Sequence, residues 1–280
     1  MNHDPIAVLI PAHNEEAVIE RTLSTLLRSA KPVEFRIYVV CNGCSDETAN
    51  RVHSNFPGVT VLELVEASKT AAINAGLRAT RAAKVLLLDA DIELSTQDAR
   101  SLTSALDDPT IDAAIGHMEI DDSDSSWAVR SFYRIWAHQP YLKNGKFAAA
   151  IALSRSMLDR IGELPNVTAD DTYLRQMISK DNTAVLDQVH FRARVPKSVT
   201  TLIRVRARVH RGNRELKRCL PDSSSPPEKR GWQFAGEIGK RPALWLDVPC
   251  YLAIAVASRF LAAKSSPSWE RDLTTRNAVS

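Results

Sequence analysis

The segment FRIYVVCNGCSDETANRV, residues 35–52, determines how the chain is interpreted, because it joins a strand, a turn and a helix start. Its first six residues are mostly β-branched or aromatic, which favours a strand. An Asn42-Gly43 pair, a strong turn signal, follows shortly afterwards. Ser45 is expected to cap the next helix, whose first turn is acidic. The segment therefore predicts a strand, a tight turn and a helix in succession.

The CNGC motif at residues 41–44 has two interpretations. Cys-x-x-Cys at the start of a helix is the spacing of dithiol redox sites, where a helix N-terminus lowers the pKa of a thiol. In the second interpretation the role of the motif is to form a tight turn at Asn-Gly. The nearby acids Asp46 and Glu47 support this interpretation, because their negative charges disfavour a thiolate. The motif alone leaves both open, so the rest of the chain has to distinguish them.

The alternation of apolar strands and amphipathic helices continues on both sides of this segment. Strands are predicted at residues 6–10, 35–40, 59–64 and 84–91, and helices at 15–29, 45–55 and 68–81. Strands that are apolar throughout and separated by helices predict an α/β fold, with a mostly parallel sheet covered by helices on both faces. Ligands of such sheets bind at the carboxyl ends of the strands. The segments PAHNEE, CNGCSDE, EASK and DADIE follow the four strands, and all are polar.

The second half of the chain alternates less regularly. Strands are expected near residues 112–120 and 146–155, and helices near 125–138, 169–179 and 198–220. Residues 221–231, PDSSSPPEKRG, resemble a linker, so we expect a domain over 1–220 and an apolar helical appendage over 232–280.

Composition places the chain among ordinary globular proteins. It has 280 residues, 44% of them hydrophobic, and a net charge of +3, which gives no general attraction to nucleic acid. Four scattered cysteines do not form a disulfide scaffold, so a reducing compartment is expected. The start of the chain lacks a basic segment before its apolar run, so no signal peptide is expected. We therefore expect a cytoplasmic protein, with peripheral contact at the inner face of a membrane as an option.

Asp89 and Asp91 follow a buried strand in the segment LLLDADIEL. Two carboxylates at the end of a strand repel each other unless a cation or hydrogen-bond donors satisfy them. Their hard oxygens suit Mg²⁺ or Mn²⁺ bridging a diphosphate. An isolated Asp-x-Asp is also compatible with a strand end and a solvated acid, so this motif needs support from others.

Five segments in order supply that support. VLIPAHNEEAVIERTLSTLL, YVVCNGCSDETA, SKTAAINAGLRAT, LLLDAD and ADDTYLR resemble the motifs of family-two glycosyltransferases over residues 6–215. This resemblance implies the GT-A fold, an inverting reaction, a nucleoside-diphosphate-sugar donor and a divalent metal held at the Asp-x-Asp motif. It also favours the turn interpretation of CNGC, because a redox site predicts none of the other motifs.

The resemblance implies a role for individual residues. The loop Pro11, Ala12, His13, Asn14 and Glu15 is expected to lie along the nucleoside. The resemblance implies roles for four further residues. Asn42 would read the base, with Cys41 in place of the usual Asp; Lys69 would meet the diphosphate; and Asp91, with Asp89, would hold the metal.

The catalytic base is expected in ADDTYLR. Asp170 occupies the position of the family's Glu, and Asp171 that of its Asp, so the resemblance assigns the base to Asp171. Inversion needs one carboxylate that removes the acceptor proton as the oxygen attacks opposite the diphosphate. One member of the pair is expected only to cap the helix, and Arg175, four residues after Asp171, to keep the base ionised.

The chain departs from the family in its later part. Processive members carry Gln-x-x-Arg-Trp, whereas residues 205–212, VRARVHRG, keep Arg208 but place valines at the Gln and Trp positions. Processive synthesis is therefore not expected. The surrounding arginines suit a diphosphate or a lipid phosphate, or form a solvated basic helix. The apolar appendage either contacts a membrane or packs on the domain, and the first is favoured because such acceptors are often lipid-linked.

The sequence predicts an inverting glycosyltransferase that moves one sugar to a hydroxyl of a saccharide or lipid-linked acceptor, in surface polysaccharide or glycolipid assembly. A nucleotidyltransferase is the rival enzyme, but its first loop is usually rich in glycine and basic, unlike PAHNEE. A non-catalytic nucleotide-sugar-binding protein is the third option.

Overall fold

The computed structural model describes the chain except for residues 1–4, 140–141, 143–144, 146, 220–233 and 265–280. The described chain forms two compact units. The first comprises residues 1–119 and 145–193, and the second comprises residues 120–144 and 194–280. The predicted linker at 221–231 lies outside the described residues, so the predicted domain boundary stays a prediction.

The sheet has eight strands in the order β3-β2-β1-β4-β7-β6-β8-β5. They are β1 (Ile6–Ala12), β2 (Phe35–Asn42), β3 (Thr60–Leu64), β4 (Lys84–Leu88), β5 (Ile92–Leu94), β6 (Ala113–Asp121), β7 (Ala150–Ser154) and β8 (Thr183–Arg194). The first four in this order are parallel, whereas β7 is antiparallel to β4 and β6, and β5 is antiparallel to β8. The predicted α/β fold is confirmed, and its parallel part is the half of the sheet that the first ninety residues build.

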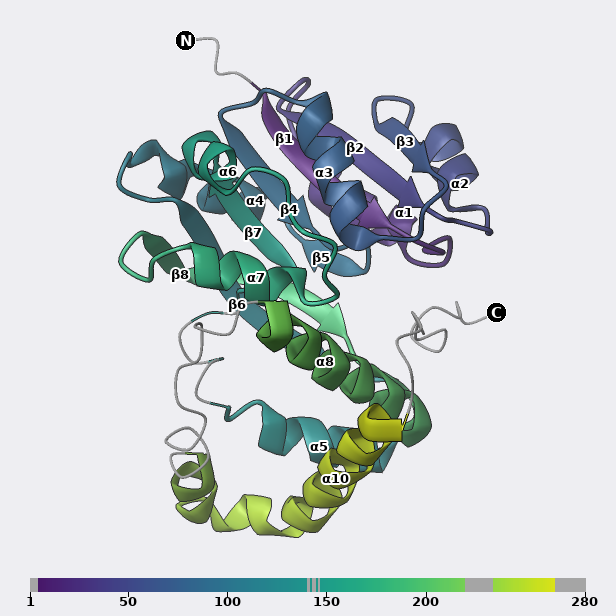
Figure 1. Ribbon diagram of the computed structural model, residues 1–280, viewed down its shortest axis with the longest axis vertical. Coiled ribbons are helices and arrows are strands. Elements are labelled where there is room, and N and C mark those ends of the chain that lie inside the picture. The colour runs from purple at the N-terminus through teal and green to yellow at the C-terminus, as the bar shows by residue number, and fades with distance from the viewer. Residues whose placement is uncertain (1–4, 140–141, 143–144, 146, 220–233, 265–280) are drawn as a thin grey trace. The chain divides into compact units, whose positions relative to one another are not determined.

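Helices of the first unit cover both faces of this sheet (Figure 1). They are α1 (Ile19–Leu27), α2 (Thr48–Asn55), α3 (Lys69–Ala79), α4 (Thr96–Ser104), followed by a 3-10 turn (Ala105–Asp107), α6 (Arg155–Ile161) and α7 (Asp170–Met177). Side chains of α1, α2 and α4 pack with Val8, Ile10 and Val39 on one face. Those of α3, α6 and α7 pack with Leu9 and Val85 on the other. The strands are therefore apolar on both sides, as the sequence predicted.

Two helices begin later than the sequence predicted. The helix expected from Glu15 begins at Ile19, and the helix expected from Ser45 begins at Thr48. The reason is that polar groups in the two loops bond to each other instead of capping their own helices. The backbone N–H of Glu15 donates to Thr48 Oγ1 at 2.7 Å, and that of Glu16 donates to Asp46 Oδ2 at 3.1 Å.

β8 is a long strand that the sequence analysis did not predict. Its buried Val189 and Phe191 alternate with exposed His190 and Arg192. It lies next to β6 in the sheet, where a Cβ added to Gly116 would come within 2.6 Å of Val189 Cγ1. Only glycine allows the two strands this approach.

The described part of the second unit consists mainly of helices. They are α5 (Trp127–Trp136), α8 (Val199–Cys219), a short helical segment at residues 234–239, a 3-10 helix η2 (Pro242–Asp247) and α10 (Val248–Lys264). α10 packs against α8 and α5, and the three helices lie side by side in Figure 1. The helices expected near residues 125–138 and 198–220 are confirmed as α5 and α8.

A buried carboxylate joins the helices of this unit. Asp247, 5% exposed, accepts hydrogen bonds from Ser131 Oγ at 2.6 Å and from Arg134 Nε and Nη2 at 2.8 and 2.6 Å. The hydrogen bonds from Arg134 lower the pKa of Asp247, against the opposing effect of burial. The ionised carboxylate is therefore the form that stabilises the fold.

Asp247→Asn is expected to lower the free energy of unfolding by about 2 kcal/mol at pH 7, the usual value of hydrogen bonds to a charged group. Because the folded pKa lies below the unfolded value, the difference from wild type should be full above the ordinary carboxyl pKa and disappear as the pH falls through the folded pKa. Urea unfolding at several pH values measures both effects. Glu163→Gln, which breaks an exposed pair with Arg78, is the control and should change little. A loss that is equally large in acid would contradict the role of the charge.

Candidate active site

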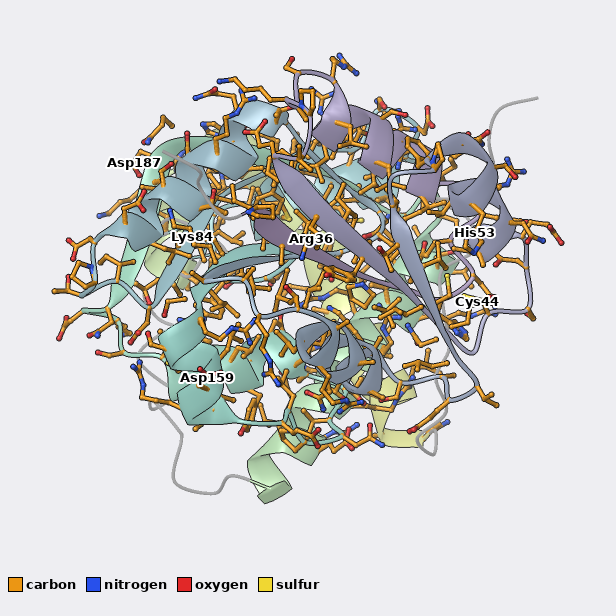
Figure 2. The ribbon with its side chains drawn as sticks, turned by 90° about the horizontal axis from the view of Figure 1, so that it is seen from above. Arg36, Cys44, His53, Lys84, Asp159 and Asp187 are labelled. Atoms are coloured by element: carbon orange, nitrogen blue, oxygen red, sulfur yellow. The ribbon has the colours of Figure 1, made fainter. Side chains whose placement is uncertain are left out.

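The loops after β1 and β2 meet at the carboxyl edge of the parallel strands. Figure 2 shows Cys44, which follows β2, and Lys84, which begins β4, on opposite sides of the view, as expected for the two edges of a parallel sheet. His13 Nδ1 lies 2.5 Å from the carbonyl oxygen of Asn42, and Asn42 Nδ2 donates to the carbonyl of Ala12 at 2.8 Å. These bonds hold the ends of β1 and β2 together.

Asn14 and Ser45 continue this connection between the two loops. Asn14 has a positive φ of 54°, a conformation that asparagine tolerates better than most residues. Its Oδ1 accepts a hydrogen bond from the backbone N–H of Ser45 at 2.8 Å. Glu15, predicted to be near the nucleoside, is 5% exposed and therefore is not a solvated helix start. Hydrogen bonds therefore join the two loops into one continuous wall.

Asn42 has a buried acceptor that the fold does not use. The residue is 1% exposed, and its Oδ1 has no hydrogen-bond partner among the described residues. Its Nδ2 is already committed to Ala12. A buried carbonyl oxygen without a donor is costly, so this position is suited to a ligand that brings an N–H group.

Cys41 and Cys44 are both free thiols in the structure. A hydrogen bond with Cys44, followed by burial, raises the pKa of Cys41, and the Asp46 carboxylate acts in the same direction. A buried thiol that resists ionisation is a poor redox nucleophile. The backbone supports the turn interpretation of CNGC, because Gly43 has a positive φ of 58° and its N–H donates to the carbonyl of Leu64 at 2.7 Å.

Lys69 lies at the centre of the acidic residues. It is the first residue of α3, whose N-cap Ser68 accepts a hydrogen bond from Ala71 N–H. Its Nζ is 2.8 Å from Asp89 Oδ1 and 3.0 Å from Asp170 Oδ2. The side chain of Asp170 is 11% exposed, and those of Lys69 and Asp89 are 33% exposed. One ammonium group therefore bridges the acid after β4 and the acid that begins α7.

The charges of this cluster shift the pKa of Lys69 and of Asp170. Burial by itself would lower the pKa of Lys69, but Asp170, Asp89 and Asp171 outweigh it and raise the pKa, so the ammonium stays charged. Burial raises the pKa of Asp170, Lys69 lowers it, and the neighbouring Asp171 and Asp89 raise it again. The net shift of the Asp170 pKa is upward, first because the carboxyl group is buried and then because Asp171 and Asp89 lie near it.

Asp170 and Asp171 occupy different environments although they are adjacent. Asp170 is buried against Lys69, whereas Asp171 is half-buried and accepts a hydrogen bond from the backbone N–H of Thr172 at 2.7 Å. The N-cap of α7 is Ala169, and it makes no side-chain cap bond. Neither aspartate is therefore the N-cap residue of the helix, in contrast to the capping role expected for one of them.

Two asparagines that the sequence analysis missed hold the segment before Asp170. Asn74 of α3 donates through Nδ2 to the carbonyl of Leu164 and accepts through Oδ1 from its N–H, both at 2.9 Å. The Oγ of Ser68 lies 3.2 Å from Asn166 Oδ1. A polar asparagine within the otherwise small and apolar AAINAG was the only signal in the sequence. These bonds fix Asp170 relative to Lys69.

Asp91 is half-buried just before β5, and no other described group donates a hydrogen bond to its carboxylate. In the part of the chain that the structure describes, no three His, Cys, Asp or Glu side chains are grouped to hold a metal by themselves. Mg²⁺ is commonly bound by one or two carboxylates, with substrate phosphates and water completing its shell. Asp91 fits such a site, whereas Asp89 is engaged by Lys69.

The remaining residues that were predicted to belong to the site lie in different parts of the structure. Pro11 and Ala12 end β1, beside Val40 and Cys41 of β2, within the wall formed by the loops. Arg175 is exposed on α7, and Arg208 belongs to α8 in the second unit. The structure thus brings together Lys69, Asp89 and Asp170, and separately joins His13 with Asn42.

Comparison with known proteins agrees with this architecture. The mannosyltransferase PcManGT of Pyrobaculum calidifontis, solved with GDP-mannose and Mn²⁺, aligns with a TM-score of 0.61 at 22% identity, over 94% of this chain and 76% of that one. Glucosyl-3-phosphoglycerate synthase of Mycobacterium tuberculosis, solved with Mn²⁺, UDP and glucosyl-3-phosphoglycerate, gives 0.57 at 19%, over 76% and 78%. TarS of Staphylococcus aureus, solved with UDP-GlcNAc, gives 0.56 at 13%, over 89% and 79%. At these identities the likeness establishes the fold, which is of the GT-A type.

Two curated relatives match a shorter region. An N-acetylglucosaminyltransferase of Rhizobium sp. (strain N33) is 29% identical over 134 residues, 45% of this chain and 29% of the relative. A 4,4'-diaponeurosporenoate glycosyltransferase of Staphylococcus aureus is 31% identical over 104 residues, 35% of this chain and 27% of the relative. The matches therefore span less than a third of the length of these relatives.

The family model for glycosyl transferase family 2 matches residues 7–162, more than half of the chain. The matched region contains the joined loops after β1 and β2, Lys69 and the Asp89 to Asp91 motif. The chain belongs to glycosyl transferase family 2.

Proposed function

We propose that this protein transfers one sugar, with inversion, from a nucleoside-diphosphate donor to a hydroxyl group of an acceptor. The observation that carries the proposal is the set of four aspartates and Lys69 at the carboxyl edge of the sheet. Asp89 and Asp170 share the charge of Lys69, whereas Asp91 and Asp171 have no ion pair with it and are left for chemistry. Transfer with inversion needs that division, with one carboxylate for the metal and one for the acceptor proton.

The loops after β1 and β2 are proposed to bind the nucleoside. The unpaired Oδ1 of Asn42 is suited to accept a hydrogen bond from a ring N–H of the base. Pro11, Ala12, His13, Asn14 and Glu15 form the wall beside it. The GDP-mannose and UDP-GlcNAc in complexes of two structural neighbours support a nucleotide sugar as the donor.

Asp91 is proposed to hold a divalent ion together with the donor diphosphate, with Asp89 held nearby by Lys69. The Mn²⁺ in complexes of two neighbours supports this choice of cofactor. When bound, such an ion stabilises the negative charge that develops on the leaving diphosphate. Lys69 adds positive charge at the same edge, although in this structure its Nζ is directed to Asp89 and Asp170.

Asp171 is proposed as the general base. It accepts the proton of the acceptor hydroxyl while that oxygen attacks the anomeric carbon from the side opposite the diphosphate. Its neighbour Asp170 is less suited, because its carboxylate is buried and held by Lys69. A carboxylate with a raised pKa is a stronger base, and in this respect Asp170 is favoured. Asp170 and Asp171 therefore have to be compared directly by mutation.

The acceptor is proposed to be a saccharide or a lipid-linked compound, in surface polysaccharide or glycolipid assembly on the cytoplasmic side of the membrane. The name of one curated relative, 4,4'-diaponeurosporenoate glycosyltransferase, supports an apolar acceptor. Its match covers 35% of this chain, so it supports the class of acceptor only.

Release of nucleoside diphosphate from a panel of UDP-, GDP- and dTDP-sugars, with Mn²⁺ or with EDTA, tests the proposal. We expect the wild-type protein to hydrolyse at least one donor slowly, and only with the metal. Asp91→Asn should keep the fold, as judged by thermal unfolding, and lose metal-dependent donor binding in calorimetry, because it removes the proposed ligand. Asp98→Asn, an acid at the start of α4, is the matched control and should behave like wild type in calorimetry.

The panel also separates the rival functions. A protein that binds nucleotide sugars without turning over any of them, even with acceptors present, would be a binding protein. Release of pyrophosphate from nucleoside triphosphates would indicate a nucleotidyltransferase. Transfer by Asp91→Asn that is undiminished and insensitive to EDTA would contradict the metal site.

Asp171→Asn is expected to lower kcat by a factor of about 10² to 10⁴, the usual contribution of a general base, with donor affinity nearly unchanged. Asp170→Asn should lower kcat less and act mainly on stability, because it removes the partner of Lys69. Steady-state kinetics of the two variants, with donor binding measured by calorimetry, compare these effects. A larger loss of kcat at Asp170 than at Asp171 would reverse the assignment.

A further inference from the structure

α10 has two opposite faces. Ile254, Ser258 and Ala262, which recur every fourth residue, are 3%, 0% and 4% exposed. Leu252, Val256 and Phe260 have the same spacing and are 53%, 48% and 65% exposed. The two rows are offset by two residues, about 200° around a helix of 3.6 residues per turn, so they point in opposite directions. One side of α10 packs on protein, and the other presents large apolar side chains.

η2, which directly precedes α10, contains two more exposed large apolar side chains. Trp245 is 56% exposed and Leu246 is 86% exposed. We use the term apolar face for the five exposed residues Trp245, Leu246, Leu252, Val256 and Phe260. Large apolar side chains that gather on one surface indicate an interaction site, whereas single ones do not.

A cavity of about 680 Å³ borders the apolar face. Trp245 and Leu252 line it, together with Phe234 and Ile238 of the preceding helical turn and Tyr251 of α10. This volume is in the range that accommodates a small molecule or part of a hydrocarbon chain. Arg259 also lines the cavity and places a positive charge beside its apolar wall.

The charge around the apolar face is positive. From Pro242 to Lys264 the sequence contains a single acid, Asp247, which is buried and bonded to Arg134. Arg259 and Lys264 are exposed. The adjoining segment has Lys240 exposed, and Arg241 paired with Glu237 at 3.2 Å. An anionic partner would therefore meet no exposed acid on η2 or α10.

The pKa of His210 on α8 is affected by the same excess of positive charge. Burial, and then Arg206, Arg259 and Arg214, lower its pKa to about 4. Two of these arginines come from α8 and one from α10, so the bases of both helices act on one histidine. His210 is consequently neutral at pH 7, which avoids a further charge there.

By length and composition, Pro242–Lys264 is the one described segment that could cross a membrane. Its packing favours a different arrangement. Asp247 is bonded to Ser131 and Arg134 near one end, and Arg214 donates to the carbonyl of Ala262 near the other. A helix that is held by its own protein along one side can offer only the opposite side to lipid.

We propose that the apolar face binds to an anionic phospholipid surface, with η2 and α10 lying in the plane of the membrane interface. The apolar side chains would enter the boundary between headgroups and acyl chains, with Trp245 at headgroup level. Arg259 and Lys264 would meet the lipid phosphates. This inference rests on the second unit alone and does not depend on the proposed transfer reaction.

Co-sedimentation of the full chain with vesicles tests the proposal. Vesicles of phosphatidylcholine containing phosphatidylglycerol should bind the wild-type protein more strongly than vesicles of phosphatidylcholine alone. Phe260→Ser should lower the partition coefficient at least about tenfold, because a large apolar side chain no longer enters the lipid. Arg259→Gln should lower binding to the anionic vesicles about fivefold and leave binding to neutral vesicles nearly unchanged.

Val65→Ser provides a matched control, because Val65 is an exposed apolar residue of the first unit, and its binding should equal that of wild type. Thermal unfolding checks that each variant is folded. Brominated phospholipids should quench part of the tryptophan fluorescence, and Trp245→Phe should remove most of that quenching.

Wild-type protein that binds neither kind of vesicle would overturn the proposal, as would Phe260→Ser binding as well as wild type does. A stable dimer in light scattering that Phe260→Ser dissociates, with no vesicle binding, would assign the apolar face to a second copy of the chain instead.

Discussion

The contact of Lys69 with Asp89 and Asp170 is the interaction on which the rest of the site depends. Asp89 follows β4 and Asp170 begins α7, and the two acids lie far apart in the sequence. Their carboxylates could not be brought to one sheet edge without a cation, since burial of like charges is costly. Lys69 supplies that cation from the start of α3, within 3.0 Å of both. The fold can therefore gather acids where a diphosphate and a metal have to be bound.

This arrangement divides four acids into two kinds. Asp89 and Asp170 share the single positive charge of Lys69, and Asp91 and Asp171 are left half-buried at the same edge. Bonds from Asn74 and between the β1 and β2 loops then fix the geometry around them. The proposed chemistry follows from this division, because a free carboxylate can bind a cation or take up a proton, whereas one held by an ammonium does neither readily.

The sequence predicted the parallel half of the fold and the motifs at its edge well, because strands buried on both faces are apolar throughout. It missed β8, although Val189 and Phe191 alternate with polar residues there, because two consecutive polar residues, Asp187 and Gln188, interrupt the period-two pattern. It placed two helix starts too early because side chains such as Thr48 bond across loops. It did not predict the contacts of Lys69 with Asp89 and Asp170, since spacing along a chain does not reveal which acids the fold brings to a lysine. A contact of Lys69 with a diphosphate stays a prediction.

A double-mutant cycle of the free energy of unfolding at neutral pH tests the charge coupling between Lys69 and Asp170. Lys69→Met should lose about 3 kcal/mol, the lower end of the cost of leaving a buried charge unpaired. Lys69→Met combined with Asp170→Asn should regain a large part of this loss, because the second change neutralises the more deeply buried acid. Losses that simply add in the double variant would contradict this coupling, since they would mean that Lys69 does not compensate the charge of Asp170.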